Sequence, residues 1–283
     1  MEKINLAALV KESLSPNNYA VNYIKNCLLF KKPCSLIRLG DGEAKLLSYP
    51  EYTSREKLEA QLKVWFGEKK LTEADIMFLK KELLEAVIES DILGLPGHGR
   101  TFNKKNDNYT TDAINCQNLW KVLVEKIGEK VLQGKLIVSA NFHHEIQEKK
   151  SIIEIIRSCN KVGFISNASK LLNFYQLYFE PLKISFIKVP GETWSRVEKS
   201  SSHYPKYYRD ICEEINGQTF KGELWWVGAG VLGKIYTARL AAKGAVAIDL
   251  GAILDGWNDS IPKERVGLAN KKTQMNLGYL NET

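Results

Sequence analysis

The sequence predicts an α/β fold, in which a mainly parallel β-sheet is covered by helices on both faces. Short apolar segments alternate along the chain with stretches that are long enough to form helices. The segments are apolar at successive positions, as in strands with two buried faces, and their alternation with helices favours a parallel sheet. Hydrophobic residues make up 44% and charged residues 26% of the 283 residues, so we expect a single globular domain over residues 1–283.

The predicted helices are clearest in the N-terminal third of the chain, where a helical segment at about 1–32 is interrupted near Ser15-Pro16. Thr72 and Asp75 have the spacing of a capping box, and apolar residues recur at helical spacing after them. The predicted helices cover residues 6–30, 55–65 and 73–90. The predicted strands cover residues 35–39, 92–95, 136–139, 162–165, 184–189, 224–227 and 245–250.

Ligands bind such sheets outside the carboxyl ends of the strands, so the polar residues that follow each strand are the candidate site. Two long loops, at 97–111 and 191–205, are the most suitable binding loops or lids. The candidate residues at this edge are Asp41, Glu43, His98, Arg100, Asn141, His143, His144, Ser166, Asn167, Glu192, Gly228, Gly230, Asp249 and Asp255.

The first predicted strand ends in Arg38-Leu39-Gly40-Asp41-Gly42-Glu43. In an extended or turn backbone, residues two apart point to the same side, so Asp41 and Glu43 could share one divalent cation. The glycines would let such a loop close around a ligand. The alternative is an ordinary Asp-Gly turn, with a solvated Glu43 that opens the next helix.

A glycine-rich turn, Gly228-x-Gly230-x-x-Gly233, follows the strand at 224–227 and opens a helix. Asp249 lies where a Rossmann ribose-binding acid would be, so an NAD(P)-dependent oxidoreductase is one alternative. The 33 residues after Leu250 are too few for the rest of a dinucleotide-binding domain in its usual order. The turn could also bind the diphosphate of another nucleotide with help from Lys234, belong to a methyltransferase, or serve only as a packing joint.

The segment from Arg38 to Glu43 resembles the Arg-Phe-Gly-Asp-Gly-Glu signature of GT-D-type glycosyltransferases. The glycine-rich turn with Lys234, followed by a strand that ends in Asp249-Leu250-Gly251, resembles the C-terminal part of the same family. Together the two motifs bracket most of the chain. In streptococcal members a His follows the last glycine, whereas this chain has Ala252. A role of that His in metal binding or donor contact therefore cannot be assumed for this chain.

The resemblance implies a Rossmann-like, metal-dependent glycosyltransferase that moves a sugar from a nucleotide-diphosphate sugar, in particular a UDP-sugar, to a bacterial glycan or glycosylated acceptor. Asp41 and Glu43 would hold Mn²⁺ or Mg²⁺, and Glu192 or Asp255 would be the general base. The donor would contact Arg38, Gly40, Asn167, Gly228, Gly230, Lys234 and Asp249. A nucleotide-binding regulatory module is the non-enzyme alternative, and it would have no need of Asp41 and Glu43.

Composition narrows the possible partners. A net charge of +7 suits a polyanionic ligand, but the lysines are scattered and no basic stripe alternates with aromatic residues, so nucleic acid is not expected.

Five dispersed cysteines without a C-x-x-C pair argue against a zinc site or a disulfide scaffold. Without a signal peptide or an apolar run of about 20 residues, we expect a cytoplasmic protein. The sequence does not indicate an oligomeric state.

Histidine and tryptophan residues have mostly structural interpretations. The four histidines lack metal-binding spacing and are expected to be structural or exposed, with His203 the best placed to contact substrate. Trp225-Trp226 is expected to pack in the core. Trp194 and Trp257 lie in loops that could place them against a sugar or a base, although core burial is the simpler interpretation.

Overall fold

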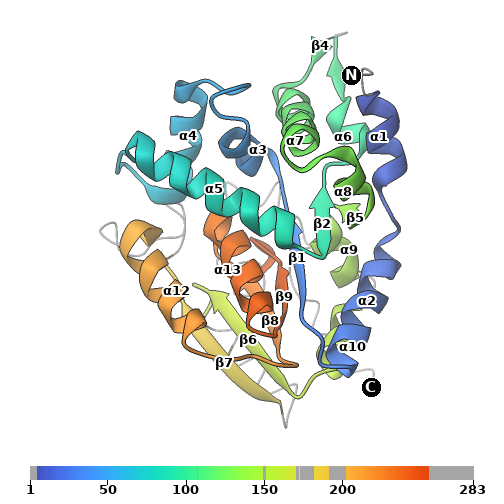
Figure 1. The fold of residues 1–283 in the computed structure, drawn as a ribbon, viewed down its shortest axis with the longest axis vertical. Coiled ribbons are helices and arrows are strands. Elements are labelled where there is room, and N and C mark those ends of the chain that lie inside the picture. The colour runs from blue at the N-terminus through green and yellow to red at the C-terminus, as the bar shows by residue number, and fades with distance from the viewer. Residues whose placement is uncertain are drawn as a thin grey trace.

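The computed structural model of the chain describes residues 5–106, 108–148, 151–169, 172, 182–190 and 202–254. These ranges contain a seven-stranded sheet with the strand order β5-β2-β1-β9-β8-β6-β7, in which all pairs are parallel. The α/β, mainly parallel architecture is therefore confirmed (Figure 1). The strands are β1 (Cys34–Arg38), β2 (Ile92–Leu95), β5 (Leu136–Ser139), β6 (Lys161–Ser166), β7 (Lys183–Lys188), β8 (Leu224–Gly228) and β9 (Val246–Asp249).

Helices cover the sheet on both faces, and most of them lie on one side (Figure 1). The more heavily covered face packs against α1 (Leu6–Ser13), α3 (Asp41–Leu47), α4 (Arg55–Phe66), α5 (Glu73–Glu89), α7 (Thr111–Ile127), α8 (Glu129–Gln133), α12 (Tyr208–Asn216) and α13 (Gly230–Ala242). The opposite face packs against α2 (Asn17–Leu29), α9 (Phe142–Glu148) and α10 (Ser151–Arg157). The break between α1 and α2 lies at the predicted interruption, and the capping box of Thr72 and Asp75 opens α5 as predicted.

The two cores explain the continuous apolar runs in the strands. Successive side chains of a strand point to opposite faces, so Trp225 enters one core and Trp226 the other, and both are buried. A Cβ atom at Gly163 of β6 would lie 2.3 Å from the Trp225 ring, so the neighbouring strand needs a glycine there. The expected packing role of this tryptophan pair is confirmed.

The position of β9 determines where the site forms. β9 is the last of the seven strands along the chain, but in the sheet it lies between β1 and β8. Leu36 of β1 is opposite Ile248, and Val227 of β8 is opposite Asp249. The segment after β1 and the glycine-rich turn after β8 therefore meet at one edge of the sheet. Residues from opposite ends of the chain become neighbours at this edge.

The structure differs from the sequence-based expectations in two loops. Residues 40–43 do not form a Gly-Asp-Gly turn, because α3 begins at Asp41 with Gly40 as its N-cap. The loop at 97–111 contains a short helix, α6 (His98–Thr101), and an antiparallel hairpin of β3 (Lys104–Lys105) and β4 (Asn108–Tyr109). Of the second long loop, only 202–205 lies within the described residues, at the start of the π-helix η1 (His203–Tyr207). None of the helices in the described ranges is both long and apolar enough to cross a membrane.

Candidate active site

A cavity of about 440 Å³ lies at the carboxyl edge of the sheet, between the ends of β1, β8 and β9 and helices α4 and α6. Most of the predicted site residues are brought together there. Those that line it are Arg38, Gly40, Asp41, Glu43, Arg100, Asn141, His143, Asn167, Gly228, Gly230 and Lys234. Asp249 lies behind this wall and is fully buried. Glu192, Asp255, Trp194 and Trp257 lie outside the described residues.

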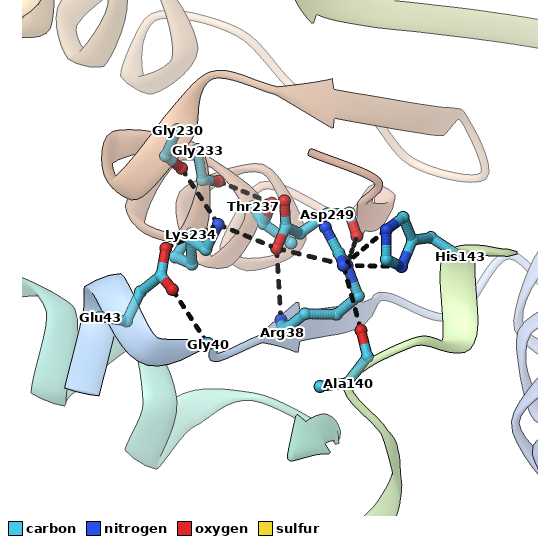
Figure 2. Close-up of polar contacts among 10 residues, drawn as sticks. All are labelled: Arg38, Gly40, Glu43, Ala140, His143, Gly230, Gly233, Lys234, Thr237 and Asp249. Carbon is cyan, nitrogen blue, oxygen red and sulfur yellow. Dashed lines mark hydrogen bonds and ion pairs between the residues drawn. The ribbon is translucent and has the colours of Figure 1, made fainter. Parts of the chain in front are cut away.

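Lys234 is the centre of the buried part of the cavity wall (Figure 2). Its Nζ lies 3.1 Å from Glu43 Oε1 and 3.2 Å from Asp249 Oδ2, and it donates a hydrogen bond to the Gly230 carbonyl at 3.1 Å. An ammonium group has three donors, and these three contacts use all of them. Lys234 can therefore contact a phosphate only by giving up a protein partner.

Arg38 joins three strand ends beneath the cavity (Figure 2). Its Nε donates to the Asp249 carbonyl at 2.8 Å, and its Nη1 donates to the Ala140 carbonyl at 3.1 Å. Nη1 also lies 2.7 Å from Nδ1 of His143. Nη2 has no hydrogen-bond partner in the described part of the chain, so it is the Arg38 nitrogen that can bind a ligand.

Glu43 has a structural role as well as its place in the cavity wall. Its Oε2 accepts a hydrogen bond from the Gly40 backbone N–H at 2.9 Å, which satisfies one backbone donor at the start of α3. Asp41 and Glu43 are two residues apart in a helix, so their side chains point about 200° apart. The predicted shared position beside one cation rested on an extended or turn backbone, and the helix does not provide it.

The buried charges stabilise one another. Burial alone would raise the pKa of Glu43, but the charge of Lys234 and the Gly40 N–H outweigh it and lower that pKa. Burial likewise opposes protonation of Lys234, yet Asp249 and Glu43 raise its pKa. Burial and the charges of Arg38, His144 and Lys234 hold the pKa of His143 far below its usual range. A neutral imidazole can accept a hydrogen bond from Arg38, so His143 has a structural role, as expected, but in the wall of the cavity.

Two glycines permit the close packing at this edge. Gly251 has φ +56°, and a Cβ atom there would lie 2.4 Å from Arg38 Nη2. A Cβ atom at Gly228 would lie 2.8 Å from the Gly251 carbonyl oxygen. The Asp-x-Gly segment therefore needs its glycine so that Arg38 can approach it.

Helix α13 opens into the cavity through Gly228, Ala229 and Gly230. The backbone N–H groups in the first turn of a helix have no partners within the helix, and no side chain caps this end. The helix dipole places partial positive charge at the same point. The start of α13 can therefore bind an anionic group.

The more exposed wall of the cavity contains two predicted residues and three that the sequence did not indicate. Asp41 and Arg100 were predicted, and they form a continuous chain of polar contacts with Lys45, Gln61 and Asp112, which we call the rim network. Gln61 belongs to α4, whose sequence indicated only an amphipathic helix. Its side chain reaches the cavity because Gly42 lets α4 pack closely: a Cβ at Gly42 would lie 2.9 Å from Trp65 and 3.3 Å from Gln61.

The residues present suit a cation only in combination with a ligand. No group of three or more His, Cys, Asp or Glu side chains within the described ranges could hold a metal ion. Asp41 is the one predicted metal ligand with an accessible carboxylate, 48% exposed, whereas Glu43 is 11% exposed and held by Lys234. Mg²⁺ is commonly bound by one or two carboxylates together with substrate phosphates, and Asp41 fits that arrangement.

Two further roles were predicted for buried residues of this region: ribose binding by Asp249 and substrate contact by His203. The Asp249 side chain has no exposed surface and is ion-paired with Lys234, so it does not present a carboxylate to a ribose. His203 lines the cavity but is buried, and its Nε2 lies 3.0 Å from the hydroxyl of Tyr236. A substrate contact from His203 stays a prediction.

The model of the family described as GT-D fold-like domain matches residues 17–257. The chain belongs to this family. The resemblance seen in the two motifs is thereby confirmed, as is the prediction of a glycosyltransferase at the level of this GT-D-like family. No curated protein sequence matches the chain.

Two solved structures share the GT-D fold with this chain. A selenomethionine-substituted structure of domain of unknown function 1792 is 18% identical, with a TM-score of 0.53, and the alignment covers 90% of this chain and 84% of the other. A second structure of that domain, described as having a distinct glycosyltransferase fold, is also 18% identical, with a TM-score of 0.50 and coverage of 93% and 84%. At this identity the likeness establishes the fold.

Proposed function

We propose that the cavity binds a nucleotide-diphosphate sugar, in particular a UDP-sugar, and that the protein transfers the sugar to a hydroxyl of a glycan or glycosylated acceptor. The observation that carries the proposal is the meeting of the two family motifs in one cavity. There the uncapped start of α13 and the side chain of Arg38 line the same cavity. A helix N-terminus and a guanidinium both favour a diphosphate.

The chemistry follows from charge. The diphosphate gains negative charge as its bond to the anomeric carbon breaks, and fixed donors aimed at that charge lower the barrier. The N–H groups of α13 and Arg38 Nη2 supply such donors. Lys234 acts as a positioning residue, because it joins α13 to β9 and α3 through Gly230, Asp249 and Glu43.

A divalent cation, Mn²⁺ or Mg²⁺, is part of the proposal. When bound, it would neutralise charge on the diphosphate, and Asp41 is the residue of the described chain best placed to hold it.

The acceptor hydroxyl must lose a proton as its oxygen bonds to the anomeric carbon. Glu192 and Asp255 remain the proposed general bases if the reaction inverts that carbon.

A thermal-shift panel tests the donor. The protein would be heated with UDP-, GDP-, CMP- and dTDP-sugars, NAD and S-adenosylmethionine, each with and without Mn²⁺. A ligand at one hundred times its dissociation constant should stabilise the fold by about 2.7 kcal/mol. We expect one nucleotide-diphosphate sugar to do so, more strongly with Mn²⁺. Stabilisation by NAD without metal would instead support the oxidoreductase alternative.

The substitution Ala229→Asp tests where the diphosphate binds. Ala229 is the N-cap of α13, and an aspartate there can accept hydrogen bonds from the first turn, which stabilises helices. The same carboxylate would occupy and repel the diphosphate site. We expect Ala229→Asp to fold and to lose donor binding by calorimetry, and the matched Ala229→Ser to retain most of it. Equal donor affinity in both variants would place the diphosphate elsewhere.

A further inference from the structure

The cavity has two polar regions of different character. In the buried region, the side chains of Arg38, Glu43, Lys234 and Asp249 are 0–12% exposed. In the rim network, the four charged side chains, on α3, α6 and α7, are 21–48% exposed. Helix α3 separates the regions, because Glu43 faces one and Asp41 the other.

The rim network is a continuous set of donors and acceptors. Lys45 Nζ donates to Gln61 Oε1 at 3.1 Å and lies 3.8 Å from Asp41. Arg100 Nη2 lies 3.5 Å from Asp41 on its other side. Arg100 is in turn fixed by two hydrogen bonds to Asp112, at 2.8 and 2.7 Å. Gln61 Nε2 donates to no group of the described chain.

We propose that the rim network is the binding subsite for the saccharide acceptor, an inference that rests on the proposed transferase function. An acceptor must reach the bound donor from solvent. Asp41, Gln61 and Arg100 line the cavity, and Asp41 and Arg100 are among its more exposed charged side chains, at 48% and 35%.

The composition of the network suits a saccharide. Two cations, Lys45 and Arg100, alternate with two carboxylates, Asp41 and Asp112. Sugar hydroxyls both donate and accept hydrogen bonds, and they therefore match alternating donors and acceptors. Since the bidentate pair with Asp112 holds Arg100 in place, binding costs little side-chain entropy.

Two substitutions test the subsite. Gln61→Met keeps the side-chain length and removes the amide. Arg100→Lys keeps the positive charge and removes the guanidinium group that forms two hydrogen bonds with Asp112. Lys57→Gln on the exposed face of α4 is the control. The donor is the nucleotide sugar that stabilises the protein most, and the acceptor probes are p-nitrophenyl glucoside, galactoside and N-acetylglucosaminide.

We expect each rim variant to raise the acceptor KM about tenfold, the effect of losing one or two hydrogen bonds. The donor dissociation constant of Gln61→Met, measured by calorimetry without Mn²⁺, should stay within about twofold of the wild type. Unchanged acceptor KM values would overturn the inference, as would a wild-type protein that binds the donor and transfers to none of the glycosides. Absence of donor binding in the wild type would instead refute the proposed function, and the acceptor subsite would fall with it.

Discussion

Lys234 and Glu43 form a buried ion pair, with 3.1 Å between Nζ and Oε1, that joins the start of α13 to the start of α3. The two helices come from opposite ends of the chain and carry the two motifs of the family. A second carboxylate, Asp249, lies 3.2 Å from the same ammonium. The pair therefore sets how the glycine-rich turn lies against the first motif, and it links stability to the geometry of the cavity.

Glu43→Gln should destabilise the protein, because it leaves the Lys234 charge buried with one carboxylate fewer. We expect a loss of about 3 kcal/mol in the free energy of unfolding, measured with urea, and a strong loss of transfer. Glu59→Gln, the same change in an exposed pair with Arg55, should cost less than about 1 kcal/mol.

The same pair predicts non-additivity. The double variant Glu43→Gln/Lys234→Met should lose less stability than the two single variants together, by at least about 1 kcal/mol. Additive losses would show that the two side chains do not depend on each other. In that case Glu43 would act through α3 alone.

Gly251→Ala should be costly for two reasons. The residue has φ +56°, and its Cβ would approach Arg38 Nη2 to 2.4 Å. We expect a loss of about 2 kcal/mol in urea unfolding and weaker donor binding by calorimetry, because Arg38 must move. Gly134→Ala, at an exposed position with φ −78°, should stay within about 0.5 kcal/mol of the wild type. Equal stabilities of the two variants would contradict the close approach.

Much of the fold could be predicted because apolar segments and helical spacing are local signals. All seven strands of the main sheet were predicted to within two residues of their observed ends. The gathering of polar residues at one edge of the sheet was also predicted. Strand order is not local: nothing in the residues of β9 indicates that it lies between β1 and β8. The contact of Arg38 with Asp249 could therefore not be predicted.

The errors at the first motif have a local cause. Gly-Asp-Gly favours a turn, yet the acidic residues after Gly40 also suit the first turn of a helix. The alternative in which Glu43 opens the next helix is correct about the helix, but Glu43 is buried and not solvated. Gln61 carried no comparable signal, because its role depends on the approach of α4 over Gly42.

The protein should lose stability on mild acidification because of His143. Its folded pKa is depressed by burial and by Arg38, His144 and Lys234, while the unfolded pKa is about 6.5. Below that pH the unfolded state binds a proton that the folded state does not, so this group lowers stability by up to about 1.4 kcal/mol per pH unit. Above pH 6.5 both states are neutral at this residue and the effect vanishes.

Urea unfolding between pH 7 and pH 5 measures this effect. His143→Gln can still accept a hydrogen bond from Arg38 and should flatten the pH dependence. His98→Gln, at an exposed histidine, should leave it as in the wild type. The same slope in the wild type and His143→Gln would mean that another group is responsible.

The last prediction concerns Asp41 and the cation. Asp41 is 48% exposed, its ion pairs with Lys45 and Arg100 are 3.8 and 3.5 Å long, and it does not cap α3, so Asp41→Asn should change stability by less than about 1 kcal/mol. If Asp41 holds the cation together with diphosphate oxygens, the variant should raise the Mn²⁺ concentration for half-maximal donor hydrolysis by at least about tenfold.

Asp210→Asn, on the exposed surface of α12, is the matched control and should behave as the wild type. Since the described part of the chain offers no cluster of three metal-binding side chains, Mn²⁺ should bind weakly to the nucleotide-free protein and much more tightly once the donor is present. Calorimetry with Mn²⁺ alone, and then with donor, separates the two cases. Tight Mn²⁺ binding without nucleotide, or an unchanged half-maximal concentration in Asp41→Asn, would remove Asp41 from the proposed cation site.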